Sequence, residues 1–84
     1  MWRVFYTKKA DAQLISLDRK ISESIYKKIR QAKQNPHHYF VKLVSFPYYK
    51  LRVGDYRVIA DLQEEVQIIA IIKIGHRKKV YREI

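Results

Sequence analysis

The chain has 84 residues, 48% of them hydrophobic, and its 18 Lys and Arg against 8 Asp and Glu give a formal net charge of +10. This length and apolar content fit one domain over residues 1–84 with a single core, and they exclude a disordered tail. The chain has no cysteine, which excludes disulfides and thiolate metal sites. So large a positive charge predicts a polyanionic partner, with nucleic acid favoured over an anionic membrane.

A short strand and a helical hairpin are predicted in the first part of the chain. Trp2 to Tyr6 alternates in the manner of a strand, and Thr7 suits the N-cap of a helix over Lys8 to Leu17. Asp18 offers a break and a second cap. Four residues form the apolar stripe of a second helix, which ends near Asn35-Pro36: Ile21, Ile25, Ile29 and Ala32.

The same region bears on where the protein acts. Lys8 and Lys9 interrupt the chain before the apolar core of a signal peptide could form. No apolar run reaches the length of a membrane span, and the longest, Ile68 to Ile72, suits a buried strand. We therefore expect a cytoplasmic protein with no membrane partner.

A β-hairpin around Gly54-Asp55 organises the second half of the chain. The alternating run from Tyr48 to Leu62 surrounds these two residues, which suit a two-residue turn. Alternation along both strands then places six residues on one covered face: Tyr49, Leu51, Val53, Tyr56, Val58 and Ala60.

The other face of this hairpin is basic. It receives Lys50, and it sets Arg52 directly opposite Arg57. Like charges in that position destabilise a sheet by up to about 1 kcal/mol, so the pairing indicates a site for an anion. Two structural alternatives stay open: Lys50 and Arg52 as solubilising residues of an exposed strand, and Arg57 in an ion pair with Asp61 or Asp55.

The remaining strands complete the predicted sheet. Pro36 to Phe46 has only weak extended character and is expected to be a connector, and Val66 to Ile74 is predicted to be a further strand. A three-residue turn over Gln63-Glu64-Glu65 would keep the two faces aligned. It pairs Leu62 with Val66, Ala60 with Ile68, Val58 with Ala70, Asp61 with Gln67 and Arg57 with Ile71.

The resulting fold class is α+β. We expect a small, mainly antiparallel four-stranded sheet, with the N-terminal helical hairpin packed on one face and a basic surface on the other. Ile68 to Ile72 forms its central strand, because it is apolar at every position, and Trp2 to Tyr6 adds beside it. Lys73 is expected near the basic face.

The last stretch leaves the central strand through Gly75 and can fold back across the basic face. It holds His76, the side chain of the tail that titrates near neutrality without help. The pair His37-His38 has no ligand spacing, no cysteine and no neighbouring acid cluster, so we assign it to a loop and expect no metal and no cofactor.

Two segments together resemble the RelE branch of the RelE/ParE toxin superfamily: Lys50 to Ile59 and, after an Ile/Val-rich strand, Gly75 to Tyr81. The resemblance runs the length of the chain, including the helical hairpin. It implies a toxin that enters the ribosomal A site and cleaves mRNA through the RNA's own 2′-hydroxyl, leaving a cyclic phosphate. It also implies a RelB-type antitoxin that blocks the toxin, so the expected partners are that antitoxin, the ribosome and mRNA.

The resemblance implies a role for four residues. Lys50 helps to activate the 2′-hydroxyl, Arg57 steadies the scissile phosphate, and Arg77 protonates the leaving 5′-oxygen or balances its charge. Tyr81 stacks on or orients a base. The expected RNA-binding residues are Tyr48, Arg52, Lys73, His76, Lys78 and Lys79.

This chain departs from the family at Tyr48, where some members have a lysine, and the departure leaves the general base unassigned. Two further functions remain as alternatives. One is a non-catalytic inhibitor of DNA gyrase similar to the ParE branch. The other is a plain RNA-binding module, whose binding would weaken about equally for each Lys or Arg removed.

Overall fold

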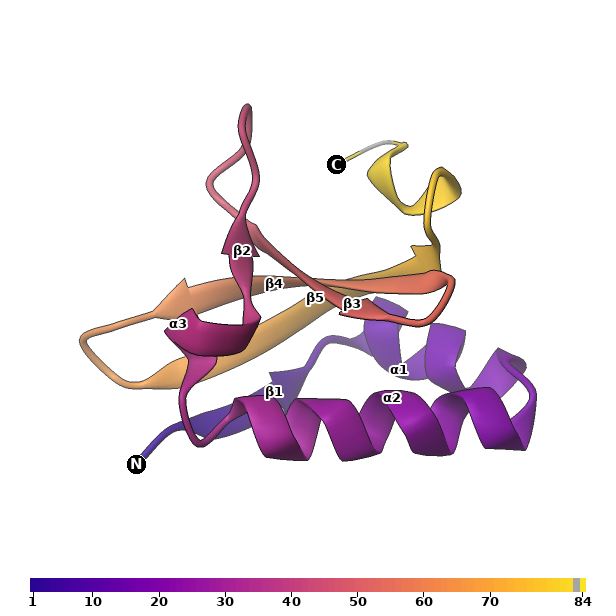
Figure 1. The fold of residues 1–84 in the computed structure, drawn as a ribbon, viewed down its shortest axis with the longest axis horizontal. Coiled ribbons are helices and arrows are strands. Elements are labelled where there is room, and N and C mark those ends of the chain that lie inside the picture. Colours follow the sequence, from indigo (N-terminus) through magenta and orange to yellow (C-terminus); the bar gives the residue numbers. More distant parts are fainter. Residues whose placement is uncertain (83) are drawn as a thin grey trace.

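A computed structural model describes residues 1–82 and 84, and it places a five-stranded mixed sheet over a layer of helices (Figure 1). The strand order is β1-β5-β4-β3-β2, with β1 parallel to β5 and every other pair antiparallel. In chain order the elements are β1 (Arg3–Tyr6), α1 (Lys8–Ser16), α2 (Arg19–Ala32), α3 (Pro36–Tyr39), β2 (Val41–Lys42), β3 (Tyr49–Val53), β4 (Tyr56–Gln63), β5 (Ile68–His76) and the 3₁₀ helix η1 (Lys79–Tyr81).

The expected α+β architecture is confirmed, and the expected number of strands is wrong. The additional strand is β2, which has only two residues and so carries no readable alternation. It forms because the Leu43 N–H donates to the Tyr48 carbonyl at 2.9 Å, which closes a loop and sets Val41 beside Lys50. The sheet is mixed rather than antiparallel because β1 runs in the same direction as β5.

The helices begin where their caps predict. The Thr7 side chain accepts a hydrogen bond from the Ala10 N–H at 3.2 Å, which satisfies a free donor at the start of α1. Asp18 precedes α2, although its side chain makes no capping hydrogen bond. The pair His37-His38 lies in the short helix α3 and not in a loop, since Pro36 is suited to a first helical turn. None of the helices described is long and apolar enough to cross a membrane.

The main core lies between the helices and one face of the sheet, which we call the lower face; the opposite face is the upper face. α1 contributes Ala10 and Leu14, and α2 contributes Ile25, Ile29 and Ala32, all of them buried. The sheet meets them with Leu51, Val58, Ala60, Leu62, Ile69, Ile71 and Ile74, and Tyr49, Val53 and Tyr56 are partly buried beside these residues. The covered face predicted for the β3–β4 hairpin is thereby confirmed.

The register between β4 and β5 differs from the prediction. Leu62 pairs with Ile69 and not with Val66, because the turn runs over Glu64 to Gln67, so it begins one residue later and is one residue longer than expected. Gln67 has a φ of 53°, a left-handed conformation that nothing in its residue type announces. As a result Ala60 pairs with Ile71, Asp61 with Ala70, Val58 with Ile74 and Arg57 with Gly75.

A β-bulge in β5 shifts the register a second time. Ala60 pairs with Ile71 while the neighbouring Ile59 pairs with Lys73, so Ile72 is the additional residue. Because side chains alternate along a strand, this one residue sends Lys73 to the upper face and Ile74 into the main core. If Ile72 paired with Ile59 in a regular ladder, Lys73 would instead point to the main core and Ile74 to the upper face.

The upper face carries a second, smaller apolar cluster, which we call the upper cluster. Its buried members are Leu43, Ile59 and Val80, and Tyr48, Ile72, Tyr81 and Ile84 are partly buried against them. Val80 and Tyr81 belong to η1, so the C-terminal segment does fold back across this face as predicted. In Figure 1 the loop after β2 and the C-terminal segment both rise on the side of the sheet away from the helices.

Candidate nucleic-acid interface

The β3–β4 hairpin presents opposed cations, as its sequence predicts. Arg52 pairs with Arg57 and Lys50 pairs with Ile59, and the turn at Gly54 has a φ of 58°, which suits glycine. Arg52 is exposed, whereas Lys50 and Arg57 are half-buried. The upper face of the hairpin therefore holds three positive side chains within one strand pair.

Arg57 is held in place by carbonyl groups and not by an acid. Its Nη1 donates to the carbonyls of Gly54 and Tyr56, each at 3.0 Å. Within residues 1–82 and 84, ion pairs join only Arg19 to Glu23 and His37 to Glu64. The alternative of an ion pair between Arg57 and Asp55 or Asp61 is therefore not found, and the charge of Arg57 remains available to an anion.

The C-terminal segment passes beside this arginine. Arg57 lies across from Gly75, and a Cβ atom added to Gly75 would lie 3.4 Å from the Cβ of Val80. The Arg77 N–H donates to the Asp55 carbonyl at 2.8 Å, which ties the segment to the hairpin turn. The backbone of Arg77 is thus fixed next to the turn that holds Arg57, and its side chain is exposed.

Two tyrosines of the predicted site are partly packed. Tyr48 and Tyr81 both contact the upper cluster and are half-buried. Their rings therefore form part of the upper face between the loop after β2 and the C-terminal segment. Lys73 is on the same face because of the bulge, and its ammonium group donates to the Arg82 carbonyl. This bond fastens the end of the chain to β5.

His76 is separated from the other predicted residues. It pairs with Tyr56, whose ring packs against the main core, and the two ring centroids are 5.6 Å apart in an edge-on arrangement. His76 thus lies on the helix side of the sheet. Lys78 and Lys79 are exposed on the segment beyond it. The structure brings together Tyr48, Lys50, Arg52, Arg57, Lys73, Arg77 and Tyr81, and leaves His76 outside.

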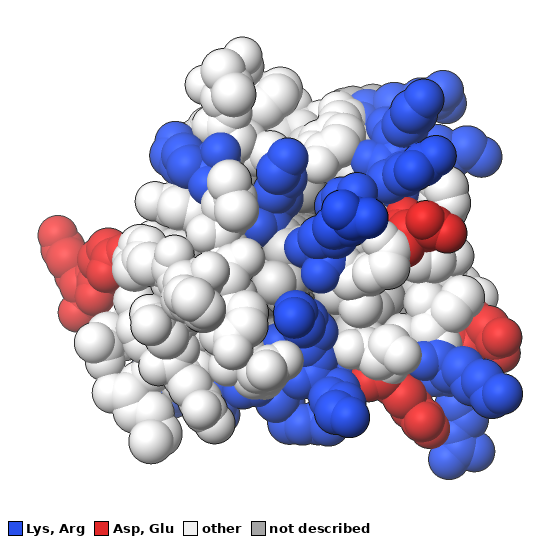
Figure 2. All heavy atoms as spheres, viewed as in Figure 1, with Lys and Arg blue, Asp and Glu red and all other residues white. Residues whose placement is uncertain are grey.

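The positive side chains are continuous over this surface. Figure 2 shows Lys and Arg across the upper part of the view, from the loop after β2 to the C-terminal segment. Sequence reasoning missed the contribution of that loop. Lys42 is exposed there, and its Nζ donates to the Phe46 carbonyl at 3.1 Å. The available signal in the sequence was a set of apolar residues in a stretch without acids: Val41, Val44 and Phe46.

His37 has a structural partner. Its Nε2 meets Glu64 Oε1, and its ring makes edge contacts with Trp2 and Tyr49 at centroid distances of 6.2 and 6.0 Å. These contacts join α3 to the β4–β5 turn. In the part of the chain described, no three His, Cys, Asp or Glu side chains gather into a group that could hold a metal ion.

The chain matches a known protein family. The family model described as ParE toxin of type II toxin-antitoxin system, parDE, matches residues 4–81. The chain therefore belongs to this toxin family, within the RelE/ParE superfamily, and the RelE-type resemblance is confirmed. No curated protein matches the chain in sequence.

Solved structures share the fold at low sequence identity. A chain of the toxin–antitoxin complex RelBE2 from Mycobacterium tuberculosis is 20% identical with a TM-score of 0.84, over 90% of this chain and 98% of that one. A chain of the RelE–RelB complex from Pyrococcus horikoshii OT3 is 25% identical with a TM-score of 0.77, covering 93% and 97%. The isolated E. coli RelE toxin is 19% identical with a TM-score of 0.76, covering 99% and 94%.

Proposed function

We propose that this toxin is a metal-independent endoribonuclease that cleaves mRNA in the ribosomal A site. The observation that carries the proposal is the position of Arg57. Its guanidinium is fixed by two carbonyls on the upper face, with no acidic partner among residues 1–82 and 84, beside the C-terminal segment that bears Arg77. Fixed cations in such a position stabilise the charge that develops on a phosphate during in-line attack.

The chemistry assigns a task to each cation. The 2′-oxygen of the RNA bonds to phosphorus as the bond to the 5′-oxygen breaks, which leaves a 2′,3′-cyclic phosphate and a 5′-hydroxyl. A base takes the proton from the 2′-hydroxyl and an acid returns one to the 5′-oxygen. Arg57 holds the phosphate, Lys50 assists the 2′-hydroxyl, and Arg77 serves the leaving oxygen. Tyr81, which packs against the upper cluster, orients a base.

The proposal includes the partners. RelE chains occur in complexes with RelB in the solved structures from three organisms. We expect a RelB-type antitoxin to neutralise this toxin, and the ribosome and mRNA to be its targets in the cytoplasm. We expect a short reading frame for the antitoxin beside the gene, and co-expression tests this partner, since the two products should purify together.

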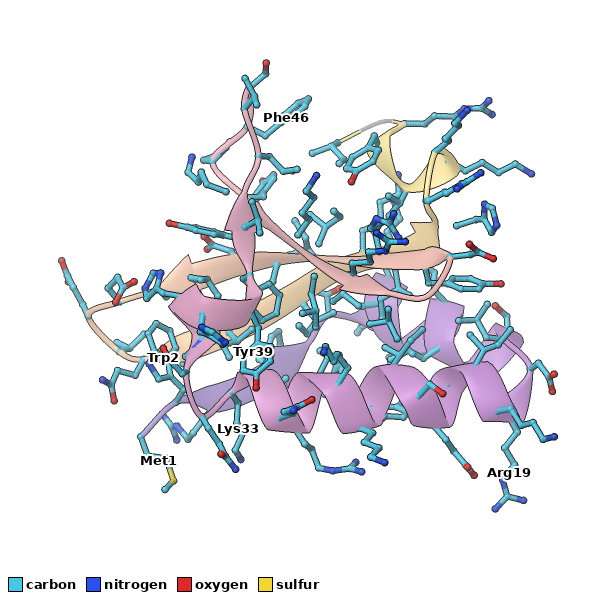
Figure 3. All side chains as sticks on the ribbon, in the orientation of Figure 1. Met1, Trp2, Arg19, Lys33, Tyr39 and Phe46 are labelled. Atoms are coloured by element: carbon cyan, nitrogen blue, oxygen red, sulfur yellow. The ribbon has the colours of Figure 1, made fainter. Side chains whose placement is uncertain are left out.

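Mapping mRNA ends in a translation extract tests the activity. The unaltered protein should produce new ends at A-site codons, and the double variant Arg57→Ala with Arg77→Ala should produce none. Arg19→Ala is the matched control, because Figure 3 places Arg19 on the helix layer, away from the upper face. Undiminished cleavage by the double variant would reject the proposal. RNA binding without cleavage by the unaltered protein would favour the plain RNA-binding module.

The family description supports one second candidate. It names the ParE toxins, and a ParE-like inhibitor of DNA gyrase would need no ribonuclease site. A supercoiling assay separates the two functions. Inhibition of gyrase by the Arg57→Ala, Arg77→Ala variant, with no cleavage of mRNA by the unaltered protein, would favour the gyrase inhibitor.

A further inference from the structure

We infer that the tip of the loop between β2 and β3 is a stacking platform on which Phe46 holds an unpaired base of the RNA bound across the upper face. This inference rests on the proposed function and adds a substrate-positioning residue to it. The loop comprises residues 43–48, and its tip is Val44 to Pro47. Figure 3 places Phe46 at the far end of this loop, on the opposite side of the sheet from the helices.

The first observation is an excess of exposed apolar side chains. Seven large hydrophobic residues of the described chain are exposed, and three of them fall within residues 41–46. Val44 is 102% exposed, Val41 57% and Phe46 37%. An isolated surface hydrophobe needs no explanation, but a concentration of them on one projecting loop marks a contact surface.

The second observation is that hydrogen bonds and packing hold the loop to the rest of the upper face. The Leu43 N–H donates to the Tyr48 carbonyl at 2.9 Å, and Lys42 Nζ donates to the Phe46 carbonyl at 3.1 Å. Leu43 is buried in the upper cluster, which anchors the base of the loop to Ile59. A loop that is already fixed loses little conformational entropy on binding, so its contacts contribute fully to affinity.

The third observation is charge, and it favours RNA over a protein partner. Residues 36–54 contain no Asp or Glu, and they include Lys42, Lys50 and Arg52. An aromatic ring beside a cationic groove is the usual arrangement for single-stranded nucleic acid, because cations follow the backbone while rings receive the bases. Stacking accepts every base, so Phe46 should strengthen binding without setting a codon preference.

The position of the loop completes the argument. The Tyr48 that ends the loop packs in the same cluster as Val80 and Tyr81 of η1. The loop and the C-terminal segment therefore both project from the upper face and pack on the same cluster, with the hairpin cations between them. An RNA strand whose phosphate lies at Arg57 would have one neighbouring base within the reach of Tyr81 and a more distant one at the loop.

Four variants test the assignment through kcat/KM for cleavage of ribosome-bound mRNA. Phe46→Ala and Phe46→Leu should both lower kcat/KM, by about fivefold to a hundredfold, because stacking on one ring contributes that much to binding. Phe46→Trp should keep the unaltered value. Ile15→Ser, which changes an exposed apolar residue of α1, is the matched control and should also keep it. Retention of the unaltered value by Phe46→Ala or Phe46→Leu would overturn the inference, since a stacking ring would then be unnecessary.

A binding measurement separates this inference from the proposed activity. The fluorescence of Phe46→Trp, less that of the unaltered chain, should be quenched when hexa-adenylate is added at low salt. If the unaltered protein fails to cleave mRNA but this quenching occurs, the ribonuclease proposal fails and the platform stands. Absence of quenching overturns the platform whether or not mRNA is cleaved. So does weaker antitoxin binding by Phe46→Ala with normal cleavage, which would assign the tip to a protein contact.

Discussion

The lower and upper faces of the sheet are built from the same strands and differ in what they bury. The lower face packs a continuous apolar layer against α1 and α2. The upper face has a smaller buried cluster, Leu43, Ile59 and Val80, and surrounds it with cations. Because side chains alternate along each strand, the inward residues of the hairpin stabilise the fold while its outward residues carry the positive charge. Substitutions on the two faces should consequently separate folding from activity.

The largest expected effect is on folding, at Leu51 of the lower face. This side chain is 1% exposed, so Leu51→Ala should lower the free energy of unfolding by about 2–5 kcal/mol through lost burial and the cavity left behind. Urea unfolding measures the change. The neighbouring Arg52→Ala, on the exposed face, is the control and should leave stability nearly unchanged or slightly higher. A loss below about 1 kcal/mol for Leu51→Ala would mean that the lower face is not the main core.

The next effect is on activity, at Arg57 of the upper face. Arg57→Ala should lower the cleavage rate by about a hundredfold to a thousandfold, because it removes a fixed positive charge from the phosphate. Its free energy of unfolding should fall by no more than about 1–2 kcal/mol, because the two hydrogen bonds lost to the turn are partly offset by relief of the repulsion from Arg52. Arg57→Lys, which keeps the charge but cannot donate in the same fork, should fall between the two in rate. Equal losses of rate and stability would contradict the separation of the two faces.

A smaller effect, of opposite sign on stability, is expected at Arg52. Arg52→Thr removes the like charge opposite Arg57 and introduces a residue that favours strands, so stability should rise by up to about 1 kcal/mol. RNA binding should weaken at the same time. Arg3→Thr is the matched control, since Arg3 is exposed on β1 and pairs with Ile68, which has no charge. If both variants gain the same stability, strand propensity and not charge is the cause.

The last effect appears only at high pH and concerns Tyr6, which packs against the main core. Burial, and to a smaller extent the nearby Tyr26, raises the pKa of Tyr6 to about 12, while Arg30 opposes the rise. Because the pKa in the folded state exceeds the ordinary value of 10.0, the contribution of Tyr6 to stability is complete below pH 10 and is lost as pH rises toward 12. Tyr6→Phe should therefore lose less stability than the unaltered protein between pH 10 and 12. Parallel losses in urea unfolding at pH 9 and 11 would contradict this.

Local signals predicted the hairpin and its charge, because a two-residue turn at Gly54-Asp55 fixes the pairing of the residues on both sides. Thr7 and the apolar stripe of α2 likewise set the helices through neighbouring residues alone. The opposed pair Arg52 and Arg57, which is the basis of the candidate site, could thus be derived from the sequence.

The remaining parts depended on longer-range packing. The left-handed Gln67 and the additional Ile72 have no distinctive residue type, and together they moved the partner of Arg57 from Ile71 to Gly75. The same shift placed His76 beside Tyr56 and not on the basic face. β2 formed only because Leu43 found a buried place in the upper cluster, which a two-residue segment does not announce.

The bulged residue Ile72 also joins the two layers. Its carbonyl accepts a hydrogen bond from the Thr7 hydroxyl at 3.4 Å, while the Thr7 N–H donates to the Ile71 carbonyl at 3.1 Å, at the start of α1. Deleting Ile72 would make the ladder regular and still leave Lys73 opposite Ile59 and Gly75 opposite Arg57. A one-residue deletion at this point would thus keep every later side chain of β5 on its present face while it removes the bond from the Thr7 hydroxyl. The cleavage rate of such a shortened chain would show how far the proposed activity of the upper face depends on this contact with the helix layer.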